Sequence, residues 1–216
     1  MSVLKLENIS FAYDKKTIFK NLNLEFEKGK VYAIIGRSGT GKTTLLSVLS
    51  GLAAPTTGKV YYDGKDIEKI NKYHFRSQYV GVVFQSFNLL TKFTAFENVS
   101  LSMDIAKFDV NDKKKYVYDL LSSVGLDEEK ANSRILKLSG GQQQRVAIAR
   151  ALSYQPEIIL ADEPTGNLDG ETQDEIIKIL KGLAAQGKCV ILVTHTPEVA
   201  KAADHVYDLS KLKKVK

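Results

Sequence analysis

The chain of 216 residues is long enough for one well-packed domain with a subdomain, and short for two independent domains. Its 44% hydrophobic and 26% charged residues are typical of an ordinary globular protein and exclude a disordered or fibrous chain. The single cysteine, Cys189, excludes an internal disulfide.

The formal net charge is +6, and the C-terminal KLKKVK contributes four lysines to it. Either this tail is solvated, or it is attracted to an anionic membrane by about 1 kcal/mol per lysine near the surface. The other basic residues are scattered among acids, so we expect no nucleic-acid partner. Apolar runs fall far short of a membrane span, and MSVLKLENIS lacks the apolar stretch of a signal peptide. We therefore expect the chain to stay in the cytosol.

Two kinds of strand are predicted along the chain. NLNLEF (21–26) alternates polar and apolar side chains, as a strand with one solvated face does, so we expect a small antiparallel sheet near the N-terminus. Uninterrupted apolar runs follow at residues 31–35, 158–161 and 189–193. Such runs are typical of a parallel sheet with helices on both faces, where Cys189 would be a small buried side chain.

Helices are predicted between these core strands. TTLLSVLS (43–50) ends at Gly51, and EIIKILKGLAA (175–185) stops before Gly187. In the second helix, Ile176, Ile177, Leu180, Leu183 and Ala184 share one apolar face.

The middle of the chain carries helix signals and little strand. Thr94 with Glu97 forms a capping box, and Asn111 begins a helical stretch whose apolar stripe ends at Gly125. We therefore expect a helical insert within a βα core.

Residues 36–43 read GRSGTGKT, which fits the phosphate-loop pattern G-x-x-x-x-G-K-[ST] and lies between a buried strand and an amphipathic helix. Glycines let successive backbone N–H groups converge on phosphate oxygens, and the helix start adds positive potential. Lys42 is expected to reach the β- and γ-phosphates, and the Thr43 hydroxyl to bind Mg²⁺. The residues expected to bind the nucleotide are Gly36, Arg37, Ser38, Gly39, Thr40, Gly41, Lys42, Thr43 and Thr44.

These elements predict an α/β fold: a P-loop NTPase core with a mainly parallel sheet, an N-terminal antiparallel β subdomain and a helical insert. We expect a single domain over residues 1–216. Its nucleotide-binding core would span 1–85 and 155–216, and its helical subdomain about 86–154.

The apolar run 158–161 ends at Asp162 and Glu163, at the carboxyl edge of the predicted sheet, where ligands bind in open α/β folds. The first acid is suited to hold the magnesium shell. The second can accept a proton from, or orient, the attacking water. The plainer alternative is that the two acids begin a solvent-exposed loop and serve only solubility.

Residues 138–145 read LSGGQQQR, a second glycine-rich helix start. Ser139 and Gln142 form an S-x-x-Q capping box, which predicts a helix that begins with Gly140 and Gly141. Exposed amides there would attract an anion, and glycines that cost about 1 kcal/mol each in a helix would let a phosphate approach the backbone. Helix capping alone is the plainer alternative.

The phosphate loop, LSGGQ, the strand ending in Asp162 and Glu163, and His195 after the last core strand together resemble the nucleotide-binding subunit of ATP-binding cassette (ABC) transporters. The resemblance covers nearly the whole chain. In that family two subunits pair head to tail, so that ATP on one phosphate loop is capped by the LSGGQ helix of the other. It implies a homodimer with composite ATP sites, to which Ser139, Gly140, Gly141 and Gln142 contribute.

The resemblance also implies ATP as ligand, Mg²⁺ as cofactor and a transmembrane permease subunit as partner. The protein would be cytoplasmic and held peripherally on the inner face of the cell membrane through the permease.

Further site residues are implied by the same resemblance. Tyr13 matches the aromatic that stacks on adenine, and Gln85 the glutamine that touches Mg²⁺ or water. Asp169 matches the acid that links the two sites, and His195 the histidine at the γ-phosphate.

The catalytic groups would be Glu163, His195, Gln85 and Lys42, and the metal ligands Thr43, Gln85 and Asp162. An ordinary strand tyrosine at Tyr13 and a polar loop residue at Gln85 are the plain alternatives. His195 is followed by Thr196, where relatives commonly have aspartate.

FQSFNLL (84–90) and PTGNLD (164–169) resemble the group that serves lipoprotein release, macrolide export and antimicrobial-peptide resistance, with a cell-division relative. The chain would then couple ATP hydrolysis to export or release of a lipophilic, peptide or antibiotic-like substrate. A regulatory ATPase of the cell-division type is an open alternative. A DNA-clamping ATPase would need a long coiled coil between the two glycine-rich motifs, where no sustained heptads occur. A small P-loop kinase would leave LSGGQ idle.

Overall fold

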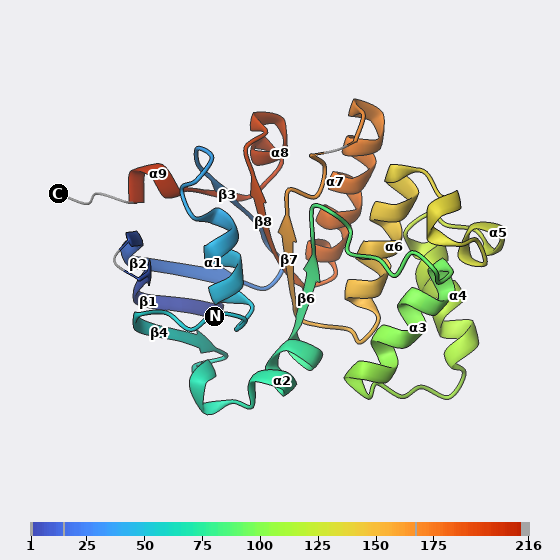
Figure 1. Cartoon of the computed structure of the whole chain (residues 1–216), viewed down its shortest axis with the longest axis horizontal. Helices are drawn as coiled ribbons and strands as arrows, with labels where there is room; N and C mark the ends of the chain where they lie inside the picture. The colour runs from blue at the N-terminus through green and yellow to red at the C-terminus, as the bar shows by residue number, and fades with distance from the viewer. Residues whose placement is uncertain (1, 15, 167, 213–216) are drawn as a thin grey trace.

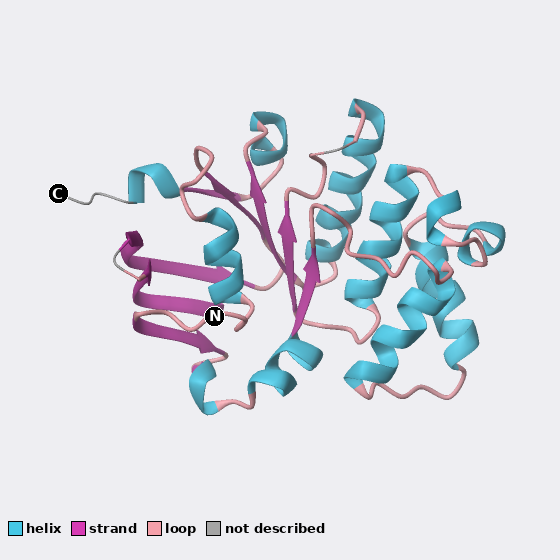
Figure 2. Cartoon of the chain, viewed as in Figure 1, coloured by secondary structure: helices cyan, strands magenta, loops and turns pink. Residues whose placement is uncertain are grey.

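The computed structural model describes residues 2–14, 16–166 and 168–212. An antiparallel sheet has the order β2-β1-β4-β5, and a parallel sheet has the order β6-β7-β8-β3-β9. The bounds of the first sheet are β1 (Ser2–Tyr13), β2 (Lys16–Glu27), β4 (Thr57–Tyr62) and β5 (Lys65–Asp66). Those of the second are β6 (Val80–Val83), β7 (Ile158–Asp162), β8 (Cys189–Thr194), β3 (Val31–Ile35) and β9 (His205–Asp208). The predicted α/β fold is confirmed (Figure 2).

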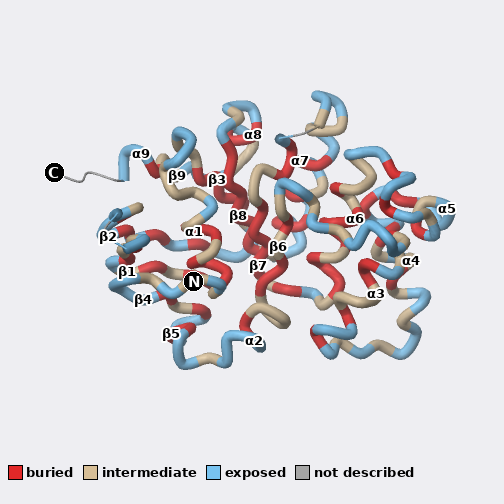
Figure 3. Tube along the Cα trace, viewed as in Figure 1, coloured by how far each residue is buried: buried red, intermediate tan, exposed pale blue. Residues whose placement is uncertain are grey.

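The parallel strands β3, β7 and β8 are almost entirely buried, which explains why they read as continuous apolar runs (Figure 3). Along β3, Val31 and Ala33 belong to one apolar cluster, whereas Tyr32 and Ile34 belong to the other. The first cluster contains the helices that follow β6, together with α7. The second contains the antiparallel sheet and α1. Cys189 is fully buried, as expected, and burial raises the pKa of its thiol to about 12.

The described helices and helical turns alternate with these strands along the chain. Their bounds are α1 (Lys42–Leu49), η1 (Ile67–Lys69), α2 (Lys72–His74), η2 (Phe75–Tyr79), α3 (Ala95–Ala106), α4 (Lys113–Ser123), α5 (Glu128–Ala131), η3 (Ile135–Lys137), α6 (Gly140–Leu152), α7 (Gly170–Ala185), α8 (Pro197–Lys201) and α9 (Leu209–Leu212). Between residues 2 and 212, leaving out the two gaps, no helix combines the length and apolar character needed to cross a membrane.

Helices α3, α4, α5 and α6 gather on one side of the parallel sheet, away from the antiparallel sheet (Figure 1). The Thr94 capping box is present: the Thr94 hydroxyl accepts from the N–H of Glu97, and the Glu97 carboxylate accepts from the N–H of Thr94. The expected helix start at Asn111 is wrong by one residue, because Asp112 caps α4 by accepting from the N–H of Lys115. An acidic cap one residue later satisfies the same unpaired donors.

Strand β9 was not expected from the sequence, since HVYD is short and carries no apolar run. It pairs with β3 through Tyr32↔His205 and Ile34↔Tyr207. The His205 ring stacks on Tyr32 with centroids 5.1 Å apart. Residues 213–216, which include three of the four C-terminal lysines, lie outside the described residues. Both interpretations of the tail therefore stay predictions.

Candidate functional site

Strand order brings the predicted site residues to one edge of the parallel sheet. Because β6, β7, β8 and β3 run parallel and in that order, their carboxyl ends meet at this edge. Gln85 follows β6, Asp162 and Glu163 end β7, and His195 follows β8, with the phosphate loop next to it after β3. Residues separated by up to 159 positions in the chain therefore follow neighbouring strands of the sheet.

The phosphate loop, residues 36–43, has the curled backbone that its glycines permit. Gly39 and Gly41 lie in the left-handed region, with φ of 74° and 88°. The Thr40 hydroxyl donates to the Arg37 carbonyl oxygen at 2.8 Å. Lys42 Nζ donates to the carbonyl oxygen of Gly36 at 2.8 Å and folds over the loop. The ammonium group therefore already lies over the cradle where phosphate oxygens would bind.

Asp162 and Thr43 form the part of the edge suited to a hard cation. The two side chains are hydrogen-bonded, and burial, followed by the neighbouring Glu163 charge, raises the pKa of Asp162 despite that bond. Hydroxyl and carboxylate oxygens are the donors that Mg²⁺ prefers, usually together with substrate phosphates and water. No group of three or more His, Cys, Asp or Glu side chains that could hold a metal alone occurs within the described ranges. The donor set thus fits a magnesium ion shared with a nucleotide.

Glu163 and His195 are in direct contact at the same edge. The Glu163 carboxylate is hydrogen-bonded to His195 Nδ1 at 2.7 Å and accepts from the His195 main-chain N–H at 3.3 Å. The Glu163 side chain is 11% exposed, whereas that of His195 is 66% exposed. Glu163 also has φ of 46°, which is uncommon for a residue with a Cβ. A sheltered carboxylate held by an accessible imidazole can orient a water molecule and take its proton.

The LSGGQ helix start is open to solvent at the same edge. Ser139 and Gln142 form the expected capping box, with both reciprocal hydrogen bonds present. The start of α6 is separated from the phosphate loop by β7, β8 and α7 (Figure 1).

The two glycines of this start differ in their surroundings. A Cβ on Gly140 would have only Leu168 Cδ2 within 4 Å, at 3.8 Å, so this position is open for a ligand. A Cβ on Gly141 would lie 2.5 Å from Thr172 Cγ2. Gly140 thus leaves space beside the helix start, whereas tight packing against α7 accounts for Gly141.

Asp169 lies at the start of α7, next to the LSGGQ helix. Its carboxylate accepts from the Thr172 N–H at 2.9 Å and from the Thr172 hydroxyl at 3.1 Å. These hydrogen bonds hold the pKa of Asp169 below its usual value. The sequence reasoning missed Thr172, although an Asp followed three residues later by Thr is itself a helix-start signal.

Tyr13 lies at the end of β1 in the antiparallel sheet, and Gln85 lies two residues after the end of β6. Tyr13 ends β1, is 56% exposed, and meets the Phe11 ring edge-on at 4.9 Å. The following strand β2 packs Ile18 against Gly41 of the phosphate loop, which brings the hairpin close to it. Gln85 is exposed, and its Nε2 lies 3.5 Å from where a Gly166 Cβ would be.

A residue that the sequence reasoning also missed is Arg150, near the end of α6. Its guanidinium donates to the carbonyl oxygens of Asn88 at 2.6 Å and Phe87 at 2.9 Å. Phe87 and Asn88 belong to the segment after Gln85 and have φ of 60° and 50°. Arg150 thus links the LSGGQ helix to the Gln85 segment.

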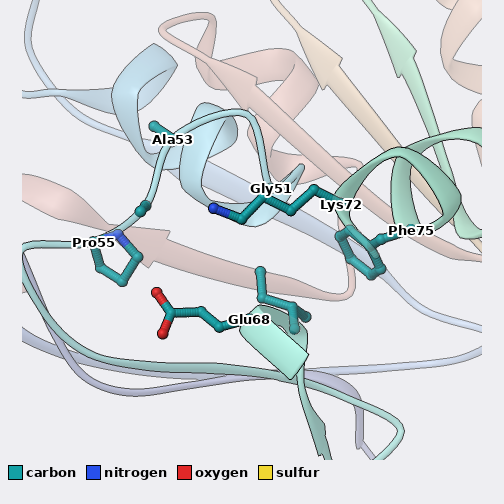
Figure 4. Close-up of a pocket in the computed structure, with 8 residues that line it drawn as sticks. Gly51, Ala53, Pro55, Glu68, Lys72 and Phe75 are labelled. Carbon is teal, nitrogen blue, oxygen red and sulfur yellow. The ribbon is translucent and has the colours of Figure 1, made fainter. Parts of the chain in front are cut away.

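Two hollows differ in their relation to this edge. One of about 570 Å³ adjoins Gly36, Arg37 and His195 and has the size of a ligand pocket. The other, of about 20 Å³, lies beneath the end of α1, where Gly51, Ala53, Pro55, Glu68, Lys72 and Phe75 line it (Figure 4). The second has room for about one water molecule and is not a nucleotide site.

Comparison with known proteins agrees with this geometry. A family model described as ABC transporter matches residues 19–166. The ABC transporter ATP-binding protein YclH of Bacillus subtilis (strain 168) is 46% identical over 98% of this chain and 95% of its own length. The macrolide export ATP-binding/permease protein MacB of Campylobacter jejuni (strain 81-176) is 42% identical over 94% of this chain, which spans 32% of MacB. Among solved structures, the dimeric post-hydrolysis state of the ATP-binding cassette MJ0796 bound to ADP and Pi superposes with a TM-score of 0.85. It is 38% identical, over 94% of this chain and 92% of that one.

Proposed function

This chain belongs to the ABC transporter ATP-binding family, and we propose that it hydrolyses ATP as the motor subunit of a membrane transporter, through sites that two copies build together. One observation carries the proposal. The phosphate loop and the LSGGQ helix start face the same edge of the sheet but lie on opposite sides of β7 and β8. Each half-site can be completed only by the other half-site of a second copy, and MJ0796 is a dimer.

In this proposal the residues of one chain bind and activate the nucleotide. The amides of the phosphate loop and Lys42 bind the phosphates, and Tyr13 packs against the base. Thr43, Asp162 and Gln85 would hold Mg²⁺, which supplies charge neutralisation between the phosphates when bound. Glu163 orients a water molecule in line with the γ-phosphate, and His195 fixes the Glu163 carboxylate at 2.7 Å and presents its exposed ring to the phosphate.

The partner copy supplies the remaining contacts in this proposal. Ser139 and the open backbone at Gly140 cover the γ-phosphate, and Asp169 crosses the interface. The capping box fixes Ser139, so its hydroxyl and the N–H groups of Gly140 and Gly141 need no rearrangement when charge develops on the phosphate. Closure of the dimer would therefore complete both sites at once, and loss of the γ-phosphate would release it.

We infer that the permease binds at a groove between the parallel sheet and α6. This hollow of about 360 Å³ is lined by Leu52, Arg76, Val80, Val82, Phe84, Asn88, Ser102, Arg150, Ala151 and Tyr154, among others. It combines the exposed Leu52 and several half-buried apolar side chains with two arginines. The Gln85 segment forms one wall, so a helix seated there would sense the nucleotide through Gln85. Binding to a permease would hold the chain on the inner face of the cell membrane.

Export or release of a lipophilic, peptide or antibiotic-like substrate is the transport activity that we propose. It rests on the similarity to MacB and on the FQSFNLL and PTGNLD motifs. A regulatory ATPase of the cell-division type would use the same ATP site and the same groove. Between Gly36 and Ser139 the longest described helix is α3, with 12 residues, which is too short for the coiled coil of a DNA clamp.

The proposal is tested by the Glu163→Gln variant, which keeps the shape of the side chain and removes the base. We expect ATP binding to persist and hydrolysis to fall by about 10²- to 10⁴-fold. An ATP-dependent dimer should accumulate, detected by size-exclusion chromatography. Turnover at the wild-type rate would show that Glu163 is not the base. Ser139→Ala is the matched variant of the other half-site, and it should slow hydrolysis while the isolated chain binds ATP as before.

A further inference from the structure

Thr172 contacts both elements that one copy offers to its partner. It lies in the first turn of α7, three residues after Asp169, and its hydroxyl and methyl groups point to different neighbours. The hydroxyl donates to Asp169 Oδ2 at 3.1 Å, beside the main-chain bond from Thr172 to Oδ1 at 2.9 Å. Both carboxylate oxygens of Asp169 are thereby held by one residue.

The methyl group of Thr172 fills the space beside Gly141. A Cβ on Gly141 would come within 2.5 Å of Thr172 Cγ2, which no real pair of carbon atoms tolerates. Gly141 has an ordinary helical backbone without a positive φ, so its lack of a side chain is required by this contact and not by its conformation. The start of α6 therefore rests directly on the start of α7.

We propose that Thr172 is a positioning residue that locks Asp169 and the LSGGQ helix start of one copy into a single rigid unit. Resting on the composite site proposed above, this unit contacts the partner's nucleotide as one body. A shift of Asp169 at the interface would then move the LSGGQ helix start with it, and hydrolysis in the partner's site would depend on Thr172 although Thr172 touches no nucleotide.

The two contacts of Thr172 can be separated by substitution. Thr172→Val keeps both branches on Cβ and removes the hydrogen bond to Asp169 Oδ2. We expect kcat for ATP hydrolysis to fall roughly threefold to tenfold, because a hydrogen bond to a charged group is lost at a partly solvated position. The affinity of the isolated chain for ATP should not change. Thr172→Ser keeps the hydroxyl and loses only the methyl contact with Gly141, so its kcat should fall by less than that of Thr172→Val.

The contact with Gly141 is tested by a rescue experiment. Gly141→Ala should lower kcat roughly tenfold or more, because the added methyl overpacks the junction between α6 and α7. Thr172→Ser removes the methyl group that the new alanine meets. The double variant Gly141→Ala/Thr172→Ser should therefore regain most of the lost kcat.

Gly140→Ala is the matched control, since its Cβ would meet nothing closer than Leu168 Cδ2 at 3.8 Å. If Gly140→Ala lowers kcat, Thr172→Ser should not restore it. An active wild-type chain whose Gly141→Ala variant is not rescued by Thr172→Ser would refute the proposed unit. A wild-type chain that fails to dimerise or to hydrolyse ATP would instead refute the composite site itself, so the two failures are distinct. Thermal unfolding of each variant confirms that the chains compared are folded.

Discussion

Arg150 should hold the Gln85 segment in place, and replacing it tests how the LSGGQ helix is linked to that segment. Arg150→Met keeps an apolar stem of similar length and removes the guanidinium. The variant loses two hydrogen bonds, at 2.6 Å to Asn88 O and 2.9 Å to Phe87 O. Phe87 and Asn88 also have positive φ values of 60° and 50°, a conformation that relaxes once the bonds are gone.

The size of the effect follows from these contacts. A hydrogen bond to a charged group contributes about 1.5 to 3 kcal/mol, so two would give about 3 to 6 kcal/mol. Two effects make the expected loss in the free energy of unfolding smaller. Asn88 is exposed, so water replaces part of its bond. Arg150 is half-buried, burial lowers its pKa, and no carboxylate in the described part of the chain lies within ion-pair distance, so removing the cation recovers desolvation energy. We expect a net loss of about 2 to 4 kcal/mol in the free energy of unfolding.

Urea unfolding followed by circular dichroism measures this loss. Arg76→Met is the matched control, because Arg76 donates one hydrogen bond to a carbonyl oxygen, that of Gly51 at 3.0 Å. Arg76→Met also loses the contact of the guanidinium carbon with the Tyr73 ring, 5.1 Å from the ring centroid, and should cost about 1 to 2 kcal/mol. If Arg150→Met unfolds at the same urea concentration as Arg76→Met, the two bonds do not hold the Gln85 segment and the reasoning is wrong.

Other side chains give simpler tests. Asp162→Asn should abolish hydrolysis and yet raise the resistance of the nucleotide-free chain to urea at pH 7, because burial raises the pKa of Asp162 and makes its ionised form costly. That gain should shrink as the pH falls through the raised pKa of native Asp162, because the native side chain then becomes protonated, and a gain independent of pH would contradict it. The Cys189 thiol, with a pKa of about 12, should react with Ellman's reagent at pH 8 only after unfolding. Fast labelling of the folded chain would count against its burial. Tyr13→Ala should weaken ATP and GTP binding alike, by roughly threefold to tenfold in a fluorescence titration, and selective loss for one base would oppose simple stacking.

Much of the fold could be predicted because burial on both faces leaves a direct mark in the sequence. The runs at 31–35, 158–161 and 189–193 became β3, β7 and β8, and the capping boxes at Thr94 and Ser139 mark the starts of α3 and α6. Strand β9 was missed because an edge strand of four residues needs few apolar side chains. The start of α4 was misplaced since Asn111 and Asp112 are both good caps.

The candidate site was predicted from local motifs, whereas its supporting contacts were not. Phosphate loops and helix caps are specified by neighbours in the chain. Thr172 against Gly141 and Arg150 against Phe87 join residues 31 and 63 positions apart, and no local pattern encodes them. Gly141 shows the consequence most clearly, because the sequence suggested a ligand contact and the structure supplies a packing contact.

A mixing experiment tests the composite site most directly. Lys42→Ala damages the phosphate loop and leaves the LSGGQ helix intact, whereas Ser139→Arg does the reverse, so each variant alone should be almost inactive. In a dimer of one copy of each, the intact loop of the second meets the intact helix of the first, and one working site forms. An equal mixture should therefore regain ATPase activity, up to about one quarter of the wild-type rate per chain, since half of the dimers are mixed and each has one site of two. If the mixture stays as inactive as its components, the two copies do not share their sites.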